Sequence, residues 1–135
     1  MAVHKAVSNK EVPPGFENDL NNIAIDFDGV IHDFSMGWHD GTCYGDPLPG
    51  SLNAIRELSK RYNIIIFTAK VKPSRPIVGG KTGHELVTEW LDKHGVLHCV
   101  SEITCEKPRA QIYIDDKGYL FKNWEDTLGY LENNL

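Results

Sequence analysis

Two aspartates, Asp26 and Asp28, stand two residues apart at the end of an apolar run. The small and branched apolar residues at 23–25 predict a buried strand. Side chains two residues apart in an extended strand lie on the same side. Two carboxylates that close repel each other unless a proton or a cation lies between them. The pattern therefore indicates a divalent cation held beside a reactive carboxylate.

Polar residues also follow two further apolar runs of the chain. Residues 64–67 are followed by Thr68, and residues 112–114 are followed by the acidic pair at 115–116, with Lys107 a few positions before them. In open parallel sheets, ligands bind at the carboxyl ends of the strands. We therefore expect these polar side chains to meet in one site.

The types and order of these residues resemble the motifs of the haloacid dehalogenase (HAD) superfamily of phosphotransferases. The resemblance consists of Asp-x-Asp-Gly-Val at 26–30, Thr68, Lys107 and the acidic pair at 115–116, and it spans about residues 22–130. An aspartate as the second acid of the first motif points to the phosphatases. The short chain looks like the small, nearly capless members. The resemblance implies a three-layer α/β sandwich with a central parallel sheet, a Rossmann-like core and a minimal cap.

The resemblance also implies roles for the four aspartates. Asp26 would be the nucleophile that forms an aspartyl-phosphate, and Asp28 would protonate the leaving oxygen and then take a proton from water. The implied cofactor is Mg²⁺, which prefers oxygen ligands. Asp26, the backbone carbonyl of Asp28 and Asp116 would hold it, and Asp115 would orient the surrounding groups.

The remaining candidates are a hydroxyl, three cations and a histidine. The resemblance implies that Thr68 hydrogen-bonds a phosphate oxygen and that Lys107 neutralises charge between Asp26 and the phosphoryl group. Lys70 and Arg109 are rival cations nearby. His32 follows the first motif closely and is a candidate for substrate contact, although a lone histidine in a loop more often has no such role.

Composition bounds the function classes. The net charge of −5 over 135 residues argues against a broad nucleic-acid or membrane surface, although a single nucleotide or a nucleic-acid end remains open. No apolar run approaches the roughly 20 residues of a membrane span. The three cysteines, Cys43, Cys99 and Cys105, show no Cys-x-x-Cys spacing and predict neither a disulfide framework nor a zinc site. We expect a cytoplasmic protein with one phosphorylated substrate as its partner.

The chain divides into a leader and one domain. Residues 1–21 are mostly polar, which predicts a flexible leader or a surface strap, and residues 22–135 form a single HAD-like phosphohydrolase domain. Residues 31–49, rich in glycine, proline and aromatic residues, predict a structured loop in the place of the family's flap. Trp38 and Tyr44 in this flap are candidates for covering a substrate, with a structural role as the more frequent alternative.

Alternating strand and helix patterns must position these groups, and they predict an α/β fold with a parallel sheet. The predicted strands are 22–27, 63–68, 97–104 and 111–114, with 119–121 as an additional edge strand. The predicted helices are 50–61, 84–94 and 124–133. The basic loop 71–83 either guides a phosphorylated ligand inward or carries ordinary solvated charges.

The leading hypothesis is a Mg²⁺-dependent phosphomonoester hydrolase. Its substrate is unassigned, and a nucleic-acid end, a phosphoprotein, a nucleotide and a sugar phosphate all remain open. One alternative is a phosphotransferase with an acceptor other than water. Another is a metal- and phosphate-binding module without turnover, against which the intact Asp28 speaks. A receiver domain carries its acidic pair on the first strand, whereas the pair comes last here.

Overall fold

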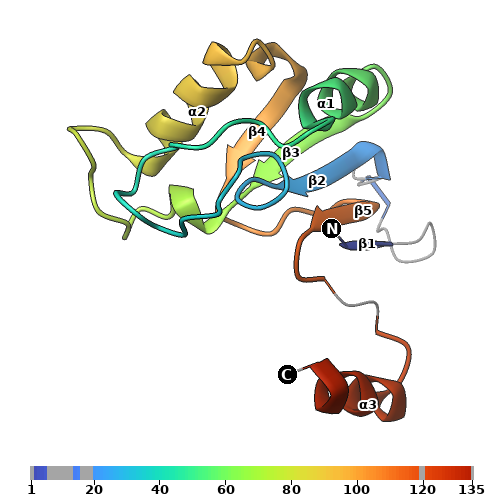
Figure 1. Cartoon of the computed structure of the whole chain (residues 1–135). Coiled ribbons are helices and arrows are strands. Elements are labelled where there is room, and N and C mark those ends of the chain that lie inside the picture. Colours follow the sequence, from blue (N-terminus) through green and yellow to red (C-terminus); the bar gives the residue numbers. More distant parts are fainter. Residues whose placement is uncertain (1, 6–13, 16–19, 119–120, 135) are drawn as a thin grey trace.

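A computed structural model describes residues 2–5, 14–15, 20–118 and 121–134. It confirms the predicted α/β class with a central parallel sheet (Figure 1). The sheet has the strand order β1-β5-β2-β3-β4. The strands are β1 (Ala2–Lys5), β2 (Asn22–Asp26), β3 (Asn63–Phe67), β4 (Val100–Thr104) and β5 (Ile112–Asp115). Strands β2 to β5 run parallel to one another, and β1 runs antiparallel to β5.

The apolar runs of β2 and β3 form the centre of the sheet. Ile23 pairs with Ile64 and Ile25 pairs with Ile66, and all four side chains are buried in the main core cluster. Central parallel strands are covered on both faces, which is why they appear in the sequence as almost unbroken apolar runs. The same pairing brings Asp26 level with Phe67, so both strands end at the same edge.

Helices α1 (Ser51–Ser59) and α2 (Gly83–Lys93) cover one face of this sheet (Figure 1). The capping box between Thr82 and Glu85 starts α2, and the apolar spacing of its inner side buries Trp90 against the core. Both helices begin and end within two residues of the predicted ranges. Each lies in the connection between two neighbouring parallel strands, which allows those strands to end at the same edge.

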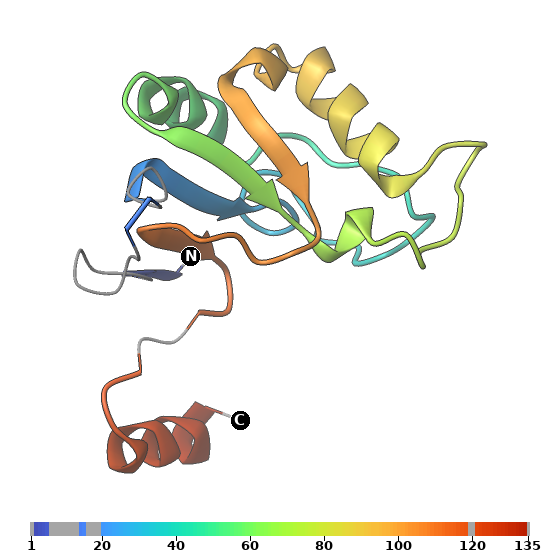
Figure 2. The ribbon, with the colours of Figure 1, turned by 180° about the vertical axis from the view of Figure 1, so that it is seen from behind.

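The opposite face of the sheet carries a connection without a helix. Residues 105–111 run from the end of β4 to the start of β5, where Gln111 donates a backbone hydrogen bond to Asn22. Helix α3 (Trp124–Asn134) lies apart from the sheet (Figure 2) and leaves Trp124 and Leu128 exposed. The connection 105–111, which the structure describes in full, contains no helix.

The predicted leader contributes an edge strand. Strand β1, at Ala2–Lys5, pairs with β5, where the sequence predicts a segment without regular structure. Pairing covers backbone groups that a bare edge strand would expose, which is a physical reason for the difference. The rest of that leader is described only at residues 14–15 and 20–21, and most of the predicted edge strand at 119–121 lies outside the described residues.

Candidate functional site

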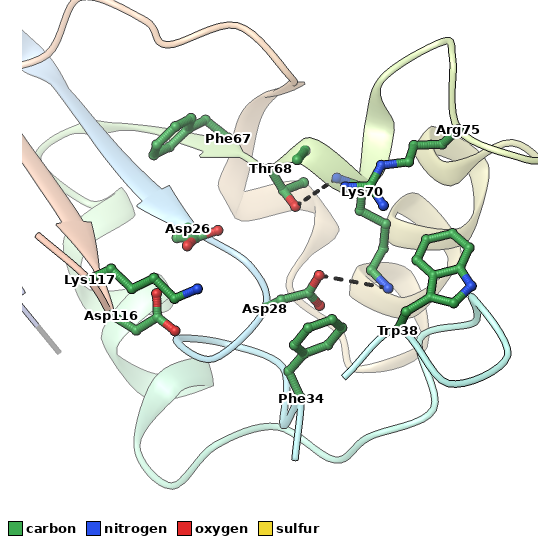
Figure 3. Close-up of a pocket in the computed structure, with 11 residues that line it drawn as sticks. Asp26, Asp28, Phe34, Trp38, Phe67, Thr68, Lys70, Arg75, Asp116 and Lys117 are labelled. Atoms are coloured by element: carbon green, nitrogen blue, oxygen red, sulfur yellow. Dashed lines mark hydrogen bonds and ion pairs between the residues drawn. The ribbon is translucent and has the colours of Figure 1, made fainter. Parts of the chain in front are cut away.

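A pocket of about 410 Å³ lies at the carboxyl ends of the parallel strands (Figure 3). Asp26 closes β2, Thr68 follows β3, and Asp116 follows β5. The structure therefore brings together Asp26, Asp28, Thr68 and Asp116, as the sequence predicts. The residues that line the pocket are Asp26, Asp28, Phe34, Trp38, Phe67, Thr68, Ala69, Lys70, Arg75, Asp116 and Lys117.

The carboxylate of Asp26 lies in a crowded, half-buried position. Its Oδ1 accepts a hydrogen bond of 2.7 Å from the backbone N–H of Phe27, which lowers its pKa. Burial outweighs this effect and, with the negative charges of Asp116, Asp28 and Asp115, raises the pKa of Asp26 to about 6. The acidic side chains are thus close enough to disfavour one another's charge, and a cation among them would relieve that repulsion.

His32 holds Asp28 in place. Its Nδ1 lies 2.9 Å from Oδ1 of Asp28, and its Nε2 accepts a 2.9 Å hydrogen bond from the backbone N–H of Gly45. Because Nε2 acts as the acceptor, the ring proton resides on Nδ1 and is donated to Asp28. The fully buried ring thus makes both of its hydrogen bonds within the protein. The sequence names His32 as a candidate for substrate contact, with no such role as the more frequent alternative, and the structure places it against Asp28.

The same histidine connects the flap to the core. Its ring stacks on Phe27 with centroids 5.0 Å apart, and it meets Trp90 edge-on at 5.6 Å. The indole Nε1 of Trp90 donates a 3.0 Å hydrogen bond to the carbonyl of Gly45. Both backbone groups of Gly45 are therefore held, and a Cβ at this position would lie 2.1 Å from the carbonyl oxygen of Asp33. Only glycine fits this contact.

Thr68 connects the end of β3 to a short helix. The buried hydroxyl accepts a 3.2 Å hydrogen bond from the backbone N–H of Lys70, which caps the helix η2 (Ala69–Val71). A hydroxyl that accepts one hydrogen bond still has its own proton to donate. Thr68 can therefore donate to a ligand oxygen in the pocket.

Lys70 lines the pocket, as Lys117 does, whereas Lys107 does not. The side chain of Lys70 is buried, and its Nζ lies 3.7 Å from Oδ2 of Asp28. Lys107 is exposed, and its Nζ lies 4.4 Å from the ring centroid of Tyr113, on the face opposite the helices. Arg109 is likewise absent from the pocket lining. The sequence names Lys70 only as a rival cation, because a single lysine after a strand carries no positional signal.

The expected magnesium ligands are consistent with the pocket. Asp26 and Asp116 both line it, and a Cβ on Gly29 would lie only 2.6 Å from Oδ2 of Asp116. The carboxylate of Asp116 therefore packs directly against the turn that follows Asp28, where Gly29 has a φ of 82°. Two carboxylates and the Asp28 carbonyl form an all-oxygen donor set of the kind that Mg²⁺ accepts.

Asp115 takes a supporting position. Its Oδ1 accepts a 2.9 Å hydrogen bond from the backbone N–H of Lys117, and it does not line the pocket. Within the described ranges, no group of three or more His, Cys, Asp and Glu side chains is placed to hold a metal ion. The expected set needs fewer side chains, because one of its ligands is a backbone carbonyl and waters complete the shell.

Aromatic and basic residues line the outer part of the pocket. Trp38, which the sequence suggests as a cover, lines it together with Phe34 and Arg75. Tyr44 does not, since its hydroxyl instead donates to the carbonyl of Gly37 at 2.9 Å. Phe34 and Lys117 are lining residues that the sequence does not single out, because only the folding of the loops brings them to the strand ends.

Two further findings concern membrane spans and known proteins. Across the parts of the chain that the structure describes, no helix is both long and apolar enough to cross a membrane. Comparison of the chain with protein-family models, with curated proteins and with solved structures found no match. What is shown is an α/β fold with a four-stranded parallel sheet.

Proposed function

We propose that this protein is a Mg²⁺-dependent phosphomonoester hydrolase of the HAD type that acts through an aspartyl-phosphate intermediate on Asp26. The observation that carries the proposal is the pocket itself. Asp26, Thr68 and Asp116 come from the ends of three different strands, and with Asp28 they line one cavity. A nucleophile, a proton donor and a phosphate-binding hydroxyl side by side are what phosphoryl transfer requires.

The reaction proceeds in two displacements at phosphorus. A carboxylate oxygen of Asp26 bonds to phosphorus as the bond to the leaving oxygen breaks, and Asp28 gives its proton to that oxygen. Asp28 then takes a proton from a water molecule, whose oxygen attacks the aspartyl-phosphate and releases inorganic phosphate. His32 orients Asp28 in both steps. The hydroxyl of Thr68 donates a hydrogen bond to a phosphoryl oxygen.

Asp26, Asp116 and the backbone carbonyl of Asp28 would hold Mg²⁺, with Asp115 fixing the turn beside them. When bound, the ion supplies positive charge that lowers the repulsion between the carboxylates and an incoming phosphate. Burial and, to a smaller extent, the neighbouring carboxylates raise the pKa of Asp26, and a bound cation would offset both effects, which supports this part of the proposal. The three cysteines are free, which is consistent with a reducing, cytoplasmic location.

Lys107 and Lys70 would act on different parts of the substrate. The resemblance assigns Lys107 to the phosphoryl group, and its ammonium lies over Tyr113, on the sheet face toward which the alternation of β2 directs Ala24 and Asp26. Lys70 instead lies beside Asp28, the proton donor for the leaving oxygen. We therefore assign Lys107 to the transferred phosphate and Lys70 to the leaving group.

The test is phosphate release from a broad panel of phosphomonoesters, with Mg²⁺ and with EDTA, beside Asp26→Asn. The substitution keeps the size of the side chain and removes the nucleophilic oxygen. Release should require Mg²⁺ and should fall by at least about 10³-fold in the variant. Full activity in Asp26→Asn contradicts the mechanism. Absence of release from every compound, with Mg²⁺ still bound, contradicts the hydrolase and leaves a transferase or a binding module.

A further inference from the structure

The ammonium group of Lys70 is buried in the pocket without a hydrogen-bond acceptor. It is the buried side-chain nitrogen or oxygen that has no hydrogen-bond partner among the described residues. Its ion-pair partner, Oδ2 of Asp28, lies 3.7 Å away, which is too far for a hydrogen bond. A buried ammonium with three unused donors is costly unless it meets acceptor oxygens. An anion in the pocket would provide them.

Aromatic rings hold this ammonium in position. Its Nζ lies 5.3 Å from the ring centroid of Phe34 and 5.7 Å from that of Trp38. Ring faces attract a cation but accept no strong hydrogen bond from it. The rings therefore orient the ammonium while its donors stay available (Figure 3).

A second cation shares the same tryptophan. The guanidinium carbon of Arg75 lies 5.3 Å from the ring centroid of Trp38, and Arg75 also lines the pocket. In the described ranges no ion pair joins Arg75 to an acidic residue. The ring of Trp38 packs closely against Gly41, because a Cβ on that glycine would lie 2.7 Å from the ring. Two cations thus lie around one ring of the pocket, which Lys117 and three aspartates also line.

The pair of cations lies on the leaving-group side of the pocket. Lys70 contacts Asp28, whereas no ion pair links it to Asp26 within the described residues. The leaving oxygen must face Asp28, so the part of the substrate attached to that oxygen extends toward Lys70, Trp38 and Arg75. A neutral leaving group would leave both cations without an anion.

We propose that Lys70 and Arg75 form a subsite for a second anionic phosphate on the leaving group. This inference rests on the proposed phosphomonoesterase function. The preferred substrates then carry one terminal phosphomonoester, which is hydrolysed, and a further phosphate or phosphodiester that stays with the product. A structural pairing of Lys70 with Asp28 alone does not account for Arg75, which has no part in that pair.

The experiment compares substrates that differ by one phosphate. Fructose 1,6-bisphosphate is paired with fructose 6-phosphate, and 5′-phosphorylated dithymidylate is paired with thymidine 5′-monophosphate. Hydrogen bonds between charged groups predict that kcat/KM is about 10- to 100-fold higher for the more highly charged member of at least one pair. The first pair tests a second phosphomonoester and the second pair tests a phosphodiester, so the preferred pair identifies the source of the anion.

Two exposed cations of one loop provide the variant and its control. Arg75→Gln should reduce the preference to less than about threefold, because it removes one of the two cations. Lys72→Gln removes the same charge from a side chain that does not line the pocket, and it should keep the preference. Equal kcat/KM values within both pairs overturn the proposal, and so does an equal loss in the two variants.

A binding measurement separates this inference from the proposed function. Titration calorimetry of Asp26→Asn with Mg²⁺ and each member of the two substrate pairs needs no turnover. Binding of the more highly charged member of at least one pair at least about tenfold more tightly than its partner supports the subsite even if the wild-type chain releases no phosphate. Equal dissociation constants within both pairs overturn the subsite while leaving an observed phosphatase activity intact.

Discussion

Asp28 is the residue whose surroundings say most about the site. One carboxylate oxygen accepts a hydrogen bond from His32, and the other faces Lys70. A proton donor must keep a fixed direction toward the leaving oxygen, since small displacements cost large factors in rate. His32 is itself fixed by Gly45 and by the rings around it. We therefore regard His32 as a positioning residue for Asp28.

Substitutions of His32 by two amides test this role. The amide nitrogen of asparagine reaches the position of Nδ1 and can still donate to Asp28, whereas the amide of glutamine reaches the position of Nε2. His32→Gln should lower kcat about tenfold more than His32→Asn, with similar KM values. The measurement is steady-state kinetics beside denaturant unfolding. Equal losses of kcat in variants of equal stability would show that His32 only fills space.

The two lysines are distinguished by a substrate without a second anion. With p-nitrophenyl phosphate, Lys107→Met should lower kcat/KM at least about tenfold, because a charge near the transferred phosphate is lost. Lys70→Met keeps the buried volume and should cost clearly less, because that substrate offers no second phosphate to Lys70. A larger loss in Lys70→Met would transfer the phosphoryl role to Lys70, as its place in the pocket also permits.

At the scale of the elements, Gly45 joins the later part of the flap at 31–49 to the start of the flap and to α2. Its N–H and its carbonyl bond to His32 and Trp90, which come from the loop after β2 and from α2. The flap therefore depends on α2 for its position, and it in turn holds the ring that supports Asp28. A long loop becomes part of a site in this way without any regular structure of its own.

Gly45→Ala tests that dependence. A Cβ would lie 2.1 Å from a backbone oxygen, so the substitution should lower the free energy of unfolding by about 2 kcal/mol and reduce activity with it. Gly129→Ala is the control, because a Cβ there meets nothing within 4 Å and Gly129 lies in α3. It should not lower the stability. Urea unfolding measures both, and a fully stable Gly45→Ala would contradict the tight contact.

At the scale of the whole molecule, one edge of the sheet concentrates negative charge. Asp26, Asp28 and Asp116 lie there within a chain whose net charge is −5. Folding buries Asp26 and brings these carboxylates together, which raises the pKa of Asp26 and costs stability when the carboxylate is charged. A cation that binds only the folded chain increases the free energy of unfolding by mass action.

Mg²⁺ should therefore raise the melting temperature. An excess of about 100 times the dissociation constant adds roughly 2.7 kcal/mol of stability. Asp116→Ala should lose most of this gain and Asp115→Ala less, because Asp116 lines the pocket and Asp115 bonds the backbone of Lys117. Calorimetric melting with Mg²⁺ and with EDTA measures the difference. A larger loss in Asp115→Ala would refute the ligand choice.

The sequence by itself indicated strands β2 to β5, the three helices and the acidic motif, but not β1. Apolar runs such as 64–67 and the spacing of Asp26 and Asp28 are local patterns, which can be read from the linear chain. Because parallel strands end at one edge, the meeting of Asp26, Thr68 and Asp116 was also predictable.

Only the tertiary structure decided which neighbours these groups receive. Lys70 and Asp28 are more than forty positions apart in the sequence. Strands β1 and β5, which pair with each other, are the first and last strands along the chain. His32 became a support for Asp28 because Gly45 and Trp90 fold around it. Such contacts depend on loop paths and packing between distant segments, for which the spacing of residues in a single sequence contains no signal.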